Sequence, residues 1–204
     1  MIWSIGIASF SIGVLALKTN YNSSNGDIDP NSDHRGAALL LLIIGVFLFV
    51  SGLAIGIMWP FPMSGGVYNV LFSGSSALGG IILIAISLTL LQRGSFKTLS
   101  IGAALFGIYL LVVAVAISSY HLTKEPEFSA LIFALLGVTA IYSAIPMHVP
   151  NKWLLRGFAF LAIITGILWI YFAAQVTLSH AAPPPLSTTT TPKPTTTPAT
   201  TPKS

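Results

Sequence analysis

The sequence predicts an all-α protein, a bundle of about six transmembrane helices followed by a disordered C-terminal tail. Two properties of its 204 residues predict this fold class: 54% of them are hydrophobic and only 7% are charged. A soluble domain carries about 25% charged residues. The mean hydropathy of +0.85 agrees, since a soluble fold of this size could not bury so much apolar surface. We therefore expect an integral membrane protein in contact with the lipid bilayer.

Six apolar stretches form the expected transmembrane domain, residues 1–180. A span needs about 20 mostly apolar residues, and none of the six contains Asp, Glu, Lys, Arg or His. The first is the shortest. No basic residue precedes it and no small-residue cleavage site follows Leu17, so a retained span is favoured over a signal peptide. The expected spans are residues 2–17, 37–58, 70–91, 98–118, 128–145 and 157–176.

The segments outside the spans differ in character. Segment 18–36 is rich in Asn, Asp and Gly and is expected to be a solvated loop. Segment 59–69 combines Pro and Gly with aromatic residues and predicts a compact cap or a shallow re-entrant loop. Pro146 is expected to stop the fifth span. The Thr/Pro-rich tail, residues 181–204, is expected to be disordered, either as an O-glycosylated stalk or as a plain tether.

Basic residues predict the orientation, because they mark cytoplasmic loops. One side of a six-span bundle receives six of them, whereas the other side has only Lys124 close to the membrane. We therefore expect a cytoplasmic-membrane protein with both termini outside. A glycan on the Asn22 sequon, which this topology puts inside, would contradict it. The six residues expected inside are Lys18, Arg35, Arg93, Lys97, Lys152 and Arg156.

Two weak candidate sites lie on the expected outer side. Tyr68 and Asn69, with Trp59 in the same segment, suit a small-ligand contact. The favoured alternative is structural, with Asn69 as a helix cap and Tyr68 as an anchor at the interface. Another cluster holds His121, Glu125 and Glu127, which suit acid–base work or a cation.

Glu127 also suits the first turn of a helix after Pro126, and that role is favoured. The spacing of the four His residues favours no metal or haem site. We therefore expect no catalytic constellation and no cofactor.

The composition also limits the partners. The charges form no basic patch, so nucleic-acid binding is not expected, and the chain has no Cys. Spans without ionisable residues disfavour proton pumps and voltage sensors. Small residues recur at spacings that let helices approach closely and allow self-association: Gly52 with Gly56, Ser76 with Gly80, Ala103 with Gly107, and Ala162 with Gly166.

A family resemblance rests on three stretches of the chain. They read Trp59-Pro60-Phe61-Pro62, then Gly66-Val67-Tyr68-Asn69-Val70-Leu71-Phe72, then Leu122-Thr123-Lys124-Glu125-Pro126. Over residues 37–145 the chain resembles DUF981, a family of small multi-pass membrane proteins of archaea and some bacteria without established activity. The resemblance implies an acidic residue and a Pro after the second stretch, where this chain has Ser73-Gly74-Ser75-Ser76.

Three functional hypotheses follow. The favoured one is a non-enzymatic structural or accessory subunit of a membrane complex, with membrane-protein partners or further copies of itself. The second is a transporter or channel for a small or apolar solute, with its outward-facing site at segment 59–69. The third is a membrane redox or lipid-modifying enzyme that uses His121 with Glu125.

Overall fold

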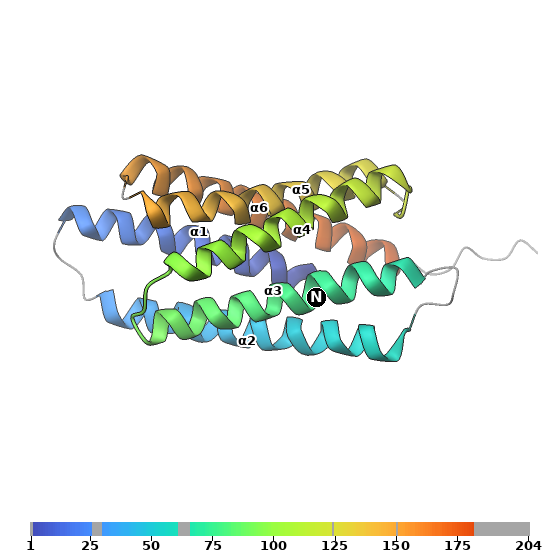
Figure 1. Ribbon diagram of the computed structural model, residues 1–204, viewed down its shortest axis with the longest axis horizontal. Helices are drawn as coiled ribbons and strands as arrows, with labels where there is room; N and C mark the ends of the chain where they lie inside the picture. The colour runs from blue at the N-terminus through green and yellow to red at the C-terminus, as the bar shows by residue number, and fades with distance from the viewer. Residues whose placement is uncertain (1, 26–29, 61–65, 124, 150, 182–204) are drawn as a thin grey trace, which may run out of the picture.

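All secondary structure in the computed structural model is helical over the residues it describes, which are 2–25, 30–60, 66–123, 125–149 and 151–181. Six helices run up and down roughly along the long axis of the molecule (Figure 1). They are α1 (Ile2–Asn25), α2 (Pro30–Met58), α3 (Gly66–Leu91), α4 (Lys97–Ser119), α5 (Pro126–His148) and α6 (Lys152–Ala181). The predicted all-α membrane bundle is confirmed.

Five of the described helices, α2 to α6, are long and apolar enough to cross a membrane. In α1 the apolar stretch is confined to Ile2–Lys18, which is shorter. The outer faces carry large apolar side chains: Ile43 is 68% exposed and Val115 is 66% exposed. Faces of this kind are stable against lipid and not against water. The chain is a multi-pass membrane protein.

The helices extend beyond the apolar stretches that the sequence marks. Helix α1 continues to Asn25 and α2 begins at Pro30, so most of segment 18–36 is helical and not a loop. Proline suits the first turn of a helix, where its missing N–H would have no partner. Helix α3 likewise begins at Gly66, inside the segment expected to be a cap or a loop. Residues 61–65 and the predicted tail from residue 182 lie outside the described residues.

Helix α5 passes through Pro146 and ends at His148. A proline removes one backbone hydrogen bond but does not have to end a helix in a membrane protein. After it, the Val149 N–H donates to the Ile145 carbonyl at 2.9 Å, which closes the last turn.

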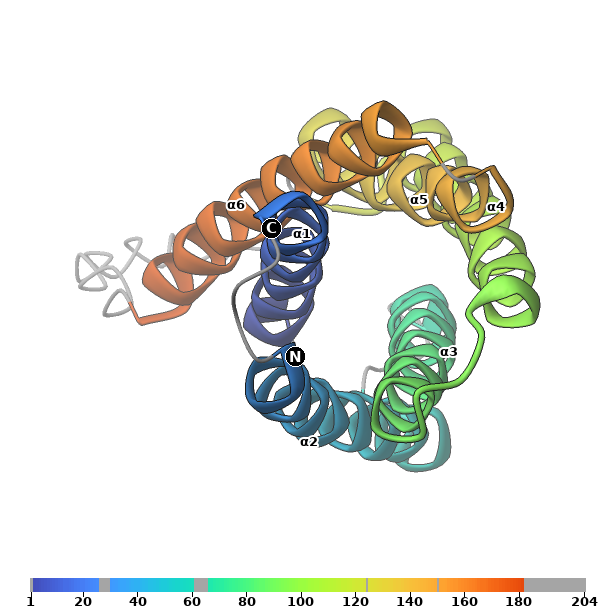
Figure 2. The same cartoon turned by 90° about the vertical axis from the view of Figure 1, so that its left-hand side faces the viewer.

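The helices pack as three close antiparallel pairs: α1 with α6, α2 with α3, and α4 with α5. Contacts between neighbouring pairs are sparser. Seen along the bundle, the helices form a ring around its axis (Figure 2). Hydroxyls join the members of two pairs, since Ser87 donates to the Ala38 carbonyl at 2.7 Å and Ser9 donates to the Ala162 carbonyl at 2.9 Å.

Glycines set the spacing within each pair. A Cβ atom on Gly107 of α4 would lie 2.5 Å from the Gly137 carbonyl oxygen of α5. A Cβ on Gly80 would lie 2.5 Å from the Phe49 nitrogen of α2, and one on Gly166 would lie 2.5 Å from the Phe10 nitrogen of α1. Only glycine lets the two backbones come this close. Three glycines that the sequence singled out therefore lie at helix contacts within the chain.

We expect Gly107→Ala to lower the free energy of unfolding by about 1–3 kcal/mol, because the new methyl group would push α4 and α5 apart. Gly102 on the same helix is the matched control, since a Cβ there would meet nothing within 4 Å. Gly102→Ala should be neutral or stabilising by up to about 1 kcal/mol, from helix propensity alone. Thermal unfolding of both variants in detergent measures the difference. Equal melting temperatures for the two variants would refute the backbone contact.

Candidate functional site

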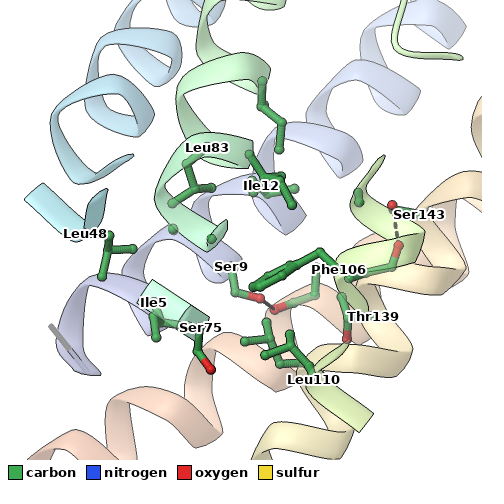
Figure 3. Close-up of a pocket in the computed structure, with 18 of the residues that line it drawn as sticks. Ile5, Ser9, Ile12, Leu48, Ser75, Leu83, Phe106, Leu110, Thr139 and Ser143 are labelled. Carbon is green, nitrogen blue, oxygen red and sulfur yellow. Dashed lines mark hydrogen bonds between the residues drawn. The ribbon is translucent and has the colours of Figure 1, made fainter. Parts of the chain in front are cut away.

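A cavity of about 140 Å³ lies inside the bundle, where the three pairs meet. Side chains from all six helices line it, and none of the described residues in the lining is ionisable. Figure 3 shows it in close-up. One lining residue from each helix, in order from α1 to α6, is Ile5, Leu48, Ser75, Phe106, Thr139 and Phe158.

Four hydroxyl side chains interrupt the apolar lining. Three of them donate to backbone carbonyls: Ser9 to Ala162, Thr139 to Leu135 at 2.8 Å, and Ser143 to Ala140 at 2.6 Å. The fourth, Ser75, is buried, and its Oγ makes no hydrogen bond among the described residues.

Thr139 also bonds the Thr165 hydroxyl of α6 at 2.8 Å. Since the Thr139 proton is directed to Leu135, we infer that Thr165 donates and Thr139 accepts. This bond ties α5 to α6 beside the cavity.

An aromatic cluster supports one wall of the cavity. Phe133 lines it and packs edge-on against Trp169 of α6, with ring centroids 5.2 Å apart. Trp169 is almost fully buried, and Phe172 and Phe128 extend the cluster along α5 and α6. Rings locked in this way make the Phe133 side of the cavity rigid.

The segment 59–69 candidates lie at one end of the bundle. Trp59 follows α2 with a φ of 46°, and its indole covers Gly66 at the start of α3. Asn69 is fully buried in the first turn of α3, so it lies inside the helix and does not cap it. The Tyr68 side chain lies outside the described part of the chain. Trp59 and Asn69 are not among the described residues that line the central cavity.

The second candidate cluster lies at the same end, between α4 and α5. Glu127 is in the first turn of α5 directly after Pro126, as predicted, and accepts the Ser118 hydroxyl at 3.0 Å. His121 and Glu125 are both exposed, and the structure shows no bond between their side chains among the described residues.

The role of His121 in the structure follows from its backbone conformation. Its φ is 48°, its N–H donates to the Ser118 carbonyl, and the Leu122 N–H donates to the Ile117 carbonyl. These are the two hydrogen bonds of a Schellman motif, which ends a helix with one left-handed residue. His121 therefore terminates α4.

The sequence does not predict the hydroxyl side chains that line the cavity. Serine and threonine in an apolar stretch give no sign of whether they bond their own helix or face a space. The replacement of an expected acidic residue and proline by Ser73-Gly74-Ser75-Ser76 was the one available signal.

Comparisons with known proteins agree on a membrane bundle. A family model described as "Protein of unknown function (DUF981)" matches residues 1–183. None of the curated proteins matches the chain.

Two solved structures share its fold. The Helicobacter pylori urea channel in its closed state, seen by cryo-electron microscopy, aligns with a TM-score of 0.72 and 16% identity, over 89% of this chain and 97% of that chain. A crystal structure of the urea channel from this gastric pathogen aligns at 0.61 and 15%, over 86% and 98%.

We expect His121→Gly to raise the free energy of unfolding by up to about 1 kcal/mol, because glycine adopts the left-handed conformation without a steric cost. Its neighbour Tyr120 is the control. Tyr120 has a φ of −105°, so Tyr120→Gly should destabilise the protein by about 0.5–1 kcal/mol. Thermal unfolding in detergent tests both. A loss of stability in His121→Gly would show that its imidazole, and not its backbone, is what matters.

Proposed function

Because the chain belongs to the DUF981 family, whose function is unknown, its activity has to be inferred from its own structure, and we propose that it is a channel for small uncharged solutes. The observation that carries the proposal is the central cavity, to which all six helices contribute. A cavity on the axis of a membrane bundle is where a solute path between the two sides would run.

The lining supports an uncharged solute. The cavity is apolar apart from four hydroxyls, and an ion that leaves water for such a site loses several kcal/mol of solvation that no counter-charge returns. A neutral solute loses far less, since a single hydrogen bond can replace much of what it gives up. The lining would thus pass small neutral molecules and reject ions.

The fold likeness supports transport by analogy. Both solved structures reported above are of the Helicobacter pylori urea channel, and its low identity to this chain carries the architecture only. We extend to this chain the general function, passage of a small neutral solute, and argue the choice of solute separately from the cavity.

We further propose that the path opens outward near segment 59–69, with Trp59, Tyr68 and Asn69 at its mouth. This end of the bundle also holds the α4–α5 connection and the end of α6 (Figure 1). The basic residues Arg93, Lys97, Lys152 and Arg156 lie on segments at the opposite end, which supports an inside position for that end.

A structural or accessory role in a larger membrane complex, favoured by the sequence, is the second proposal. Gly102 supports it, because this exposed glycine leaves open space on the outer face of α4 where another helix could approach. The other small-residue positions give it less support, because Gly80, Gly107 and Gly166 contact helices of the same chain. The chain's partner could equally be a second copy of itself.

We expect Gly79→Leu to block solute flux. Gly79 lines the cavity, and a Cβ there would lie 3.3 Å from the Phe106 ring, so a leucine side chain would fill the space. Stopped-flow light scattering of proteoliposomes under a gradient of urea or acetamide measures the flux, which should fall at least about tenfold toward the leak of protein-free liposomes.

Gly102→Leu is the control for this measurement. It makes the same change at a lipid-facing position of the neighbouring helix α4 and should leave the flux unchanged. If correctly folded wild-type protein in proteoliposomes passed no neutral solute, this result would refute the channel proposal and favour an accessory role.

The orientation can be tested because the chain contains no cysteine. Ser95 in the α3–α4 connection and Tyr120 at the end of α4 are both exposed, at opposite ends of the bundle. We expect a membrane-impermeant maleimide to label Tyr120→Cys in intact cells and Ser95→Cys only after the cells are permeabilised. The reverse pattern would invert the proposed topology.

A further inference from the structure

Among the described residues that line the cavity, one has a hydroxyl without a hydrogen bond to the rest of the described chain. Ser75 is 6% exposed, and its Oγ has no partner among the described residues. The hydroxyls of Ser9, Thr139 and Ser143 are already donated to carbonyls. A buried hydroxyl without a partner costs free energy that an alanine methyl group would not. The Ser75 Oγ itself has almost no exposed surface in this rotamer. A molecule in the cavity that offers a hydrogen-bonding atom would remove the cost once the side chain turns toward it.

The rest of the cavity lining has few groups that could form a hydrogen bond with such a molecule. Figure 3 shows Ser75 among apolar side chains of the lining, including Ile5, Leu110 and Phe106. An apolar cavity of roughly 150 Å³ in another protein stays dry and binds a benzene-sized molecule, and this cavity measures about 140 Å³. A solute that enters must shed its water, and each polar group that finds no new partner opposes entry.

From these observations we propose that Ser75 binds the polar atom of a small neutral solute whose remaining surface is largely apolar. The inference rests on the proposed channel function and narrows it, because the cavity should favour solutes with few hydrogen-bond donors. Acetamide and urea form a matched pair of nearly equal size and shape. Acetamide has a methyl group where urea has a second amide nitrogen, so the cavity should prefer acetamide.

The test compares flux of the two solutes through full-length protein in proteoliposomes, after subtraction of the protein-free leak. Wild-type protein should pass acetamide several-fold faster than urea. Ser75→Ala should lower the acetamide flux at low concentration roughly tenfold. Ser75→Thr keeps the hydroxyl and should retain most of the flux.

Ser87→Ala is the matched control. Ser87 is also a buried serine of α3, but its hydroxyl donates to the Ala38 carbonyl and does not line the cavity. This variant should keep the ratio of acetamide flux to urea flux. Faster flux of urea than of acetamide in the wild type, or equal losses in Ser75→Ala and Ser87→Ala, would overturn the proposal.

A second readout separates this site from the channel function. Saturation-transfer NMR in detergent detects acetamide bound to the protein through its methyl protons, whether or not it crosses a membrane. We expect transfer in the wild type and in Ser75→Thr, and its loss in Ser75→Ala. Transfer without any flux would refute the channel and keep the site, whereas flux without Ser75-dependent transfer would refute the site and keep the channel.

Discussion

Backbone contact at glycine is the interaction on which this bundle depends. Lipid is as apolar as a leucine side chain, so helices in a membrane gain nothing by hiding apolar surface from it and must associate through close packing. The contact of Gly107 with Gly137, and those of Gly80 and Gly166 with neighbouring backbones, close the three pairs. Because the space within each pair is used up, the remaining free volume collects between the pairs, on the axis of the molecule.

The sequence predicts the fold well and the site poorly, for one physical reason. Long apolar stretches without charge leave a chain no stable environment except a bilayer, and this constraint can be read from each stretch separately. The cavity depends on which helices meet, a long-range property that no single stretch contains. Ser75 and Ser143 look alike in sequence. The Ser143 hydroxyl nevertheless bonds its own helix, whereas the Ser75 hydroxyl bonds no described residue.

Two of the polar residues that drew attention in the sequence lie at helix ends. His121 ends α4 through its backbone conformation, and Glu127 begins α5 beside Pro126. Asn69 lies fully buried in the first turn of α3. Polar side chains are conspicuous in a chain that is only 7% charged. In a membrane protein, however, such residues also commonly begin or end helices at the membrane–water interface. The residue for which we propose solute binding is instead Ser75, a serine within a span.

The glycines that close the pairs and the side chains that line the cavity are separate sets of residues. Gly80, Gly107, Gly137 and Gly166 do not line the cavity, and the lining residues Ser75, Phe106 and Phe133 are not these contacts. A substitution at a lining residue such as Ser75 can therefore change the cavity without touching these glycine contacts. Backbone contacts of this kind constrain few side chains, so the fold can persist when most of the sequence differs, and at 16% identity this chain and the Helicobacter pylori urea channel have the same fold.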